Sequence, residues 1–192
     1  MDTKLTIKVI LGSTRQGRFS EKPGAWILGE LKKRAEVEAE LLDLRDFPMP
    51  FFEEAVTPSS KKEPYTNAAV AAWTKKIGEG DAYIIIAPEY NHGYPAVLKN
   101  ALDYVSQEWN KKPVAFISYG SAMGARSVEQ LRQVAIELQM APVRNAIHMP
   151  WDTVVAGSNG DPETFTPYAE RATGLIEQLL WWADALKAAR AK

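Results

Sequence analysis

The stretch from Asp81 to Asp103, DAYIIIAPEYNHGYPAVLKNALD, constrains the fold of this chain more than any other. It opens with a continuous apolar run, Ala82 to Ala87, which is typical of a strand covered by helices on both faces. Pro88 lacks an N–H and is expected to stop that strand. Apolar residues return at helical spacing after Pro95. Proline is tolerated where a helix begins, so a helix is predicted to start there. This order predicts a doubly wound sheet with its ligand site at the carboxyl end of the strand.

The same alternation of strand and helix continues along the whole chain. Strands are predicted over residues 5–12, 37–44, 82–87, 113–119 and 143–149, and helices over 20–35, 67–79, 96–107, 125–140 and from 167 onward. Ser20 is the expected N-cap of the first helix. Strict alternation implies a parallel sheet between two helical layers. Five strands suit the flavodoxin-like order 2-1-3-4-5, and we expect one α/β domain over residues 1–192.

Two long connections, over residues 45–66 and 150–166, show neither helical nor strand periodicity. A loop as long as the first is uncommon in a compact domain and is usually functional or mobile. The first contains the segment from Phe47 to Phe52, FPMPFF, which is too apolar to extend into water. We therefore expect it to pack on the body of the protein or on a neighbouring subunit.

Composition and charge exclude several classes of function. The formal net charge is −1, so bulk charge gives no reason to expect a nucleic-acid partner. The chain has no cysteine and two histidines, which argues against disulfides, thiolate ligands and a dedicated metal site. No apolar run approaches the roughly 20 residues of a membrane span, and no signal peptide is visible at the start. We expect a soluble cytoplasmic protein.

A first polar loop, GSTRQGRFS over residues 12–20, joins a predicted strand to a helix amino terminus. Unpaired N–H groups and the helix dipole favour a phosphate at such a position. Hydroxyls and guanidiniums could add further bonds, from Ser13, Thr14, Ser20, Arg15 and Arg18. The alternative is an ordinary turn with a serine cap and two solvated arginines. The glycine spacing matches neither a dinucleotide fingerprint nor a nucleotide-triphosphate loop, which disfavours resident NAD and ATP.

Three segments strongly resemble the NADPH-dependent FMN reductase family, which has a flavodoxin-like fold and includes quinone, azo-dye and chromate reductases. They are GSTRQGRFSEK, PEYNHGYPAVLKNALDY and SYGSAMGARSVEQLR. The resemblance implies that the FMN phosphate lies on Ser13, Arg15 and Ser20, with Thr14, Gln16, Gly17 and Arg18 nearby. It places the isoalloxazine edge against Pro88, Glu89, Tyr90, Asn91, His92 and Gly93, and a third loop beside it with Ser118, Tyr119, Gly120 and Gly124. The pair Pro23-Gly24 departs from the family pattern and puts only the first helical turn in doubt.

The resemblance also implies an activity. We expect an oxidoreductase that passes hydride from NAD(P)H through N5 of the flavin to a quinone-like acceptor, in a ping-pong reaction. No catalytic side chain is expected beyond the flavin, although N–H groups of Asn91, His92 and Gly93 could stabilise charge on the ring. His92 is more often a hydrogen-bonding loop residue than a base. The alternatives are an FMN, azo or chromate reductase, and a flavodoxin-type electron carrier or redox sensor.

Similar proteins pair the helix that follows the second loop with its copy in a homodimer, and some form homotetramers. In this chain that helix carries Lys99, Asn100, Asp103 and Tyr104. A solvated helix face is the alternative, and it suits Lys99 better than Tyr104.

Overall fold

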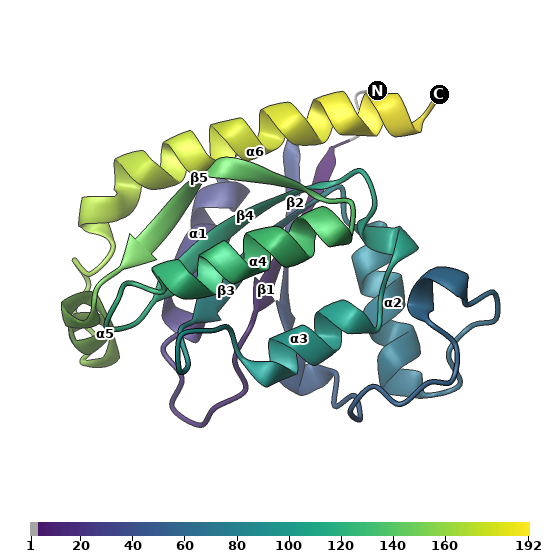
Figure 1. The fold of residues 1–192 in the computed structure, drawn as a ribbon. Helices are drawn as coiled ribbons and strands as arrows, with labels where there is room; N and C mark the ends of the chain where they lie inside the picture. Colours follow the sequence, from purple (N-terminus) through teal and green to yellow (C-terminus); the bar gives the residue numbers. More distant parts are fainter. Residues whose placement is uncertain (1–3) are drawn as a thin grey trace.

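The computed structural model describes residues 4–192 and contains one five-stranded parallel sheet in the order β2-β1-β3-β4-β5 (Figure 1). The predicted strand order and fold class are confirmed. The pairing brings distant segments together: Ile7 of β1 lies opposite both Ala39 of β2 and Ala82 of β3. The strands are β1 (Leu5–Leu11), β2 (Val37–Asp43), β3 (Ala82–Pro88), β4 (Pro113–Tyr119) and β5 (Ala141–Met149).

Helices cover both faces of the sheet and form two hydrophobic cores. One face packs on α1 (Glu21–Lys32) and α6 (Ala169–Arg190), and the other on α2 (Ala68–Glu79), α3 (Ala96–Asp103) and α4 (Ala125–Glu137). Every residue of β3 and β4 is buried, which explains their continuous apolar runs. Within residues 4–192 no helix is both long enough and apolar enough to cross a membrane.

The expected loop over residues 150–166 is wrong in part, because α5 (Trp151–Ser158) lies within it. Only Val154 and Gly157 of this helix are buried, so its sequence has little helical periodicity. Gly157 lets α5 approach Phe19 closely, since a Cβ at this position would lie 2.7 Å from the Phe19 ring. The helix therefore packs against the end of the first polar loop.

Several predicted element ends also differ from the structure by a few residues, among them the ends of β3 and α3. β3 includes Pro88 as its last residue, opposite Tyr119 of β4. This is tolerated because the next ladder bond is donated by the N–H of Glu89 to the Tyr119 carbonyl, at 3.1 Å. Helix α3 ends at Asp103 rather than at residue 107, and a short 3₁₀ turn, Gln107–Trp109, follows it.

The connection over residues 45–66 packs on the body of the protein, as its apolar sequence predicts. It contains only two short 3₁₀ turns, Leu44–Asp46 and Pro58–Ser60. The Phe47 ring packs on Trp73 of α2 at a centroid distance of 5.2 Å, and Phe52 packs on Tyr104 at the same distance. Tyr104, expected on a helix face shared with a second copy, is instead only 2% exposed within its own subunit.

Candidate functional site

Three loops meet at the carboxyl ends of the central strands. They are the β1–α1 loop (residues 12–20), the β3–α3 loop (residues 89–95) and the β4–α4 loop (residues 120–124). The Ser13 hydroxyl lies 2.8 Å from the Tyr90 phenol, which joins the first loop to the second. A Cβ at Gly12 would lie 2.8 Å from the Ile86 carbonyl, so this close approach of β1 to β3 requires glycine. The structure thus brings the predicted loops together at one edge of the sheet.

The β1–α1 loop presents hydrogen-bond donors that the protein itself does not use. In the described part of the chain, the N–H groups of Thr14, Gln16 and Gly17 form no hydrogen bond, and that of Arg15 reaches the Ser13 hydroxyl only at 3.4 Å. Gly17 has a φ of 63°, which turns the loop toward α1. Unused N–H groups ahead of a helix amino terminus suit a phosphate group.

The Ser20 hydroxyl is the most unusual group of this loop. It is fully buried, and in the described residues it has no hydrogen-bond partner. Ser20 stands at the N-cap of α1, but its side chain makes no capping bond, contrary to the sequence expectation. The phenol of Tyr119 lies beside it, but no hydrogen bond joins the two hydroxyls. Because buried hydroxyls without partners are rare, this one fits a ligand oxygen.

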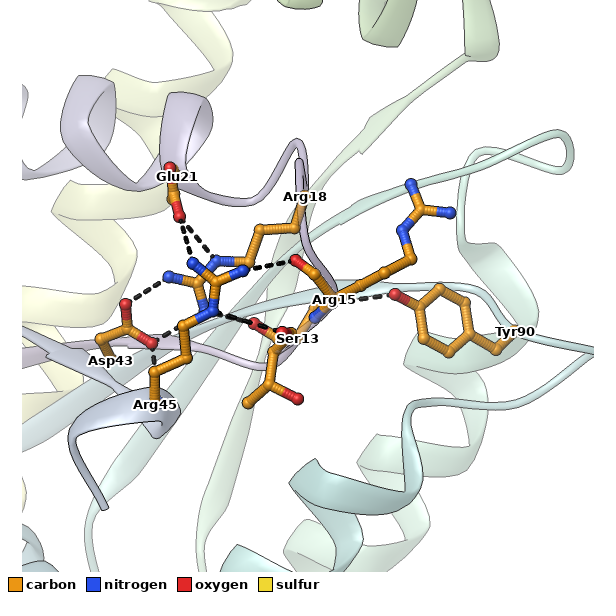
Figure 2. Close-up of polar contacts among 8 residues, drawn as sticks. Ser13, Arg15, Arg18, Glu21, Asp43, Arg45 and Tyr90 are labelled. Carbon is orange, nitrogen blue, oxygen red and sulfur yellow. Dashed lines mark hydrogen bonds and ion pairs between the residues drawn. The ribbon is translucent and has the colours of Figure 1, made fainter. Parts of the chain in front are cut away.

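Arg18 is committed to protein groups rather than open to a ligand. Its guanidinium is buried and pairs with both carboxylate oxygens of Asp43, with Glu21 and with the Ser13 carbonyl (Figure 2). Burial alone would raise the pKa of Asp43, but the hydrogen bonds and positive charges of Arg18 and Arg45 together outweigh burial and hold that pKa below its ordinary value. The Arg15 guanidinium points away from this cluster and is exposed (Figure 2). Of these two predicted phosphate arginines, only Arg15 remains accessible.

The β3–α3 loop contains a tight turn whose conformation is set by the backbone. Tyr90 and Gly93 exchange two hydrogen bonds, of 2.8 and 3.0 Å, across Asn91 and His92. Both central residues are left-handed, with φ of 49° and 71°, as a type I′ turn requires. Their side chains are exposed at the edge of the site. The turn is therefore held at the end of β3 by its own backbone hydrogen bonds.

Two side chains of α4 hold this turn in place. Arg126 pairs with the carboxylate of Glu89, whose side chain is only 4% exposed, and donates to Nε2 of His92 at 2.8 Å. Gln130 donates to the His92 carbonyl at 2.8 Å. A guanidinium can only donate, so Nε2 of His92 accepts this bond. The Nε2 lone pair is therefore used within the protein, and the expectation that His92 is not a catalytic base stays a prediction.

The β4–α4 loop is shaped by left-handed backbone and by one buried hydroxyl. Gly124 has a φ of 73°, and a Cβ there would lie 2.5 Å from the Ser118 Cβ, so glycine is required. Ser118 donates to the Met123 carbonyl at 2.8 Å and accepts from Nδ1 of His148 at 2.7 Å. Burial raises the pKa of the Tyr119 phenol to about 12, so this side chain stays neutral beside the loop.

Four residues of the site could not be identified from the sequence: Asp43, Arg45, Arg126 and Gln130. A weak signal existed for Asp43, because it ends the second strand and must lie at the same edge of the sheet. Arg126 and Gln130 lie on a helix at positions with no local signal that distinguishes them from solvated residues.

The fold and the loop chemistry together define a flavodoxin-like α/β protein whose first polar loop, at the switch point of its sheet, has groups suited to a phosphate. The family model described as NADPH-dependent FMN reductase matches residues 5–152. The chain belongs to the NADPH-dependent FMN reductase family. It is therefore an oxidoreductase that uses FMN and a reduced nicotinamide.

Similar proteins come from fungi and bacteria. The NAD(P)H-dependent FMN reductase C4B3.06c of Schizosaccharomyces pombe is 36% identical, over 90% of this chain and 89% of its own. The quinone reductase of Escherichia coli K12 is 33% identical, over 72% of this chain and 73% of its own. Among solved structures, the flavoenzyme NAD(P)H:(acceptor) oxidoreductase FerB of Paracoccus denitrificans has a TM-score of 0.74 at 22% identity, covering 94% of this chain and 98% of that one. At that identity the structural match supports the fold alone.

Proposed function

We propose that this reductase transfers hydride from NAD(P)H to a quinone-like acceptor in a ping-pong reaction. When bound, FMN supplies the redox chemistry, and the protein supplies binding, orientation and electrostatics. Because no side chain of the site is arranged as a nucleophile or as an open base, the chain acts mainly by holding groups in place. The quinone reductase among the relatives supports the choice of acceptor.

The single observation that carries the proposal is the set of hydrogen-bond donors in the β1–α1 loop that have no partner within the described residues. A phosphate monoester there would take up the unused N–H groups of Thr14, Gln16 and Gly17 together with the buried Ser20 hydroxyl. Arg15 would add a charge-assisted bond from the exposed side. Ser13 would complete the set, exchanging its bond to the Tyr90 phenol for a phosphate oxygen.

The other two loops would border the ring. The β3–α3 loop would offer the edge from Pro88 to Gly93, with Asn91 and His92 exposed at its turn. The β4–α4 loop, with Ser118, Tyr119, Gly120 and Gly124, would lie beside the ring, and Gly124 would act by letting this loop pack closely on Ser118. Donors at the turn would stabilise negative charge on a reduced ring. If the nicotinamide and the acceptor use the same accessible face of the flavin ring in turn, the reaction follows a ping-pong scheme.

The visible spectrum of the purified protein, with FMN added if it is colourless, tests the proposal. We expect the flavin bands to bleach on anaerobic mixing with NADPH or NADH, and to return when a quinone is added. Double-reciprocal plots of the initial rate against NADPH concentration, at several fixed quinone concentrations, should be parallel for the ping-pong scheme. Intersecting lines would refute it.

Other outcomes separate the alternatives. Bands that return with an azo dye or chromate but not with a quinone would change the acceptor and keep the flavin site. Flavin that binds but does not bleach with either nicotinamide would indicate an electron carrier or redox sensor. A protein that binds no flavin would contradict the proposed site altogether.

We also propose that the protein assembles as a homodimer or homotetramer. The exposed face of α3, where Lys99 pairs with Asp103 at 2.5 Å, is the surface that the family resemblance suggests. Sedimentation velocity of the FMN-loaded protein measures this directly, and a monomer at micromolar concentration would exclude it. A Tyr104 substitution is not a suitable probe, because that side chain is buried within the subunit.

A further inference from the structure

We infer that Arg18 and Arg45 are positioning residues that preorganise the β1–α1 loop for a phosphate, without contacting the phosphate themselves. The inference rests on the proposed function of that loop. Three consecutive carbonyls, of Ser13, Thr14 and Arg15, accept hydrogen bonds from these two guanidiniums (Figure 2). Arg45 alone binds two of them, the Thr14 oxygen at 3.2 Å and the Arg15 oxygen at 2.7 Å.

The direction of these carbonyls also fixes the direction of the N–H groups that follow them. In a trans peptide the carbonyl of one residue and the N–H of the next point in opposite directions. Holding the Ser13 and Arg15 carbonyls on the arginine side therefore turns the N–H groups of Thr14 and Gln16 to the other side. These are two of the amides that form no hydrogen bond within the described chain. The same arrangement keeps partially negative carbonyl oxygens away from an incoming dianion.

The two arginines do not attract a phosphate through a net positive charge, because carboxylates balance their charges. Arg18 pairs with Asp43 and Glu21, and Arg45 also pairs with Glu21, at 3.2 Å. Two positive charges thus face two carboxylates, so the cluster has no formal net charge. Its contribution is the direction of the backbone, whereas the attractive charge comes from Arg15. Both arginines are matched to this task because a planar fork of donors can hold two acceptors at once.

The inference predicts an effect confined to the phosphate. Riboflavin shares the ring of FMN but lacks the phosphate, so a disordered loop should weaken FMN binding and leave riboflavin binding almost unchanged. A general loss of structure would weaken both ligands alike. The ratio of the two dissociation constants is therefore the informative quantity.

Arg45→Gln is the principal variant, because Arg45 lies at the surface and its replacement should leave folding intact. Fluorescence titration with FMN and with riboflavin should show FMN binding weakened about tenfold and riboflavin binding changed less than about twofold. Arg45→Lys keeps the charge but loses the fork, and should lose nearly as much FMN affinity. Arg34→Gln, which removes a distant surface charge paired with Glu177 at 3.7 Å, is the matched control and should behave as the wild type.

Equal losses for both flavins in Arg45→Gln, or no loss for either, would overturn the inference. Full FMN affinity in Arg45→Lys would also overturn it, since charge alone would then suffice, as would an Arg34→Gln variant that loses FMN affinity to the same extent. Arg18→Gln should reduce the FMN affinity further if its thermal unfolding shows that it folds; retention of wild-type FMN affinity would count against the inference. A wild-type protein that binds neither flavin would instead refute the proposed function.

Discussion

Replacing Ser20 by alanine should stabilise the FMN-free protein, which is the opposite of what a serine at a helix N-cap normally predicts. An ordinary cap hydroxyl bonds to the first-turn amides, and its loss costs about 0.5–2 kcal/mol. The Ser20 hydroxyl makes no such bond, is fully buried and has no partner within the described residues. The two interpretations therefore predict opposite signs.

The magnitude follows from the cost of burying an unpaired hydroxyl. That cost is about 1–3 kcal/mol, and alanine removes the group while leaving a void smaller than a methyl group. We expect a net gain of about 1 kcal/mol in the free energy of unfolding. For a chain of this size this corresponds to roughly 2–4 °C in the melting temperature. In the FMN-bound protein Ser20→Ala should instead lower the free energy of unfolding, because one charge-assisted bond to the phosphate, worth about 1.5–3 kcal/mol, is lost.

Differential scanning calorimetry on the FMN-free and FMN-saturated forms of both proteins measures the two effects together. We expect Ser20→Ala to melt higher than wild type without FMN, while its FMN affinity falls roughly tenfold to a hundredfold. Ser20→Thr keeps the hydroxyl and serves as the matched control for FMN binding.

A Ser20→Ala protein that is less stable without FMN would refute the reasoning. It would mean that the hydroxyl is hydrogen-bonded in solution, and the Tyr119 phenol beside it would be the first partner to consider. Greater stability without any change in FMN affinity would support the burial argument and remove Ser20 from the phosphate site.

Four further predictions concern other parts of the structure. Arg15→Ala should weaken FMN binding by about 1.5–3 kcal/mol in a fluorescence titration, and unchanged affinity would remove Arg15 from the site. Gly124→Ala should lower the free energy of unfolding in urea by at least about 2 kcal/mol, because its Cβ would meet Ser118. Gly160→Ala, at a φ of 80° with no atom within 4 Å, should lower it by about 1 kcal/mol. Equal losses would contradict the close-contact argument. Burial lowers the pKa of Lys112 to about 8 in the folded protein, so the unfolded chain binds more protons between about pH 8 and 10.5 and stability should rise with pH there. Urea unfolding at pH 7.5 and pH 10 should show a gain of about 2–3 kcal/mol relative to Lys112→Met, and a pH-independent difference between the two proteins would argue against this shift. His92→Ala should keep the rate of NADPH oxidation within about tenfold with flavin bound, and a far larger loss would indicate a proton relay.

Much of the fold was predictable because its signals are local. Continuous apolar runs indicate strands buried on both faces, and prolines and glycines mark where each strand gives way to a loop. These patterns predicted the strand order and the edge of the sheet where the three loops meet, both of which the structure confirms. Helix α5 was missed because it is short and buries only two residues, which leaves no periodic signal.

What the sequence by itself determined is the kind of protein: a parallel α/β sheet of the FMN reductase family, with hydroxyls, arginines and glycines in its first polar loop. Only the tertiary structure decided what each of those groups does. Arg18 and Arg15 look equivalent in the sequence, yet one is paired with Asp43, 25 residues away, and the other is exposed. Likewise Tyr104 is buried because the 45–66 connection packs over it. Partners so distant along the chain meet only after the sheet has formed, so no local pattern can reveal them.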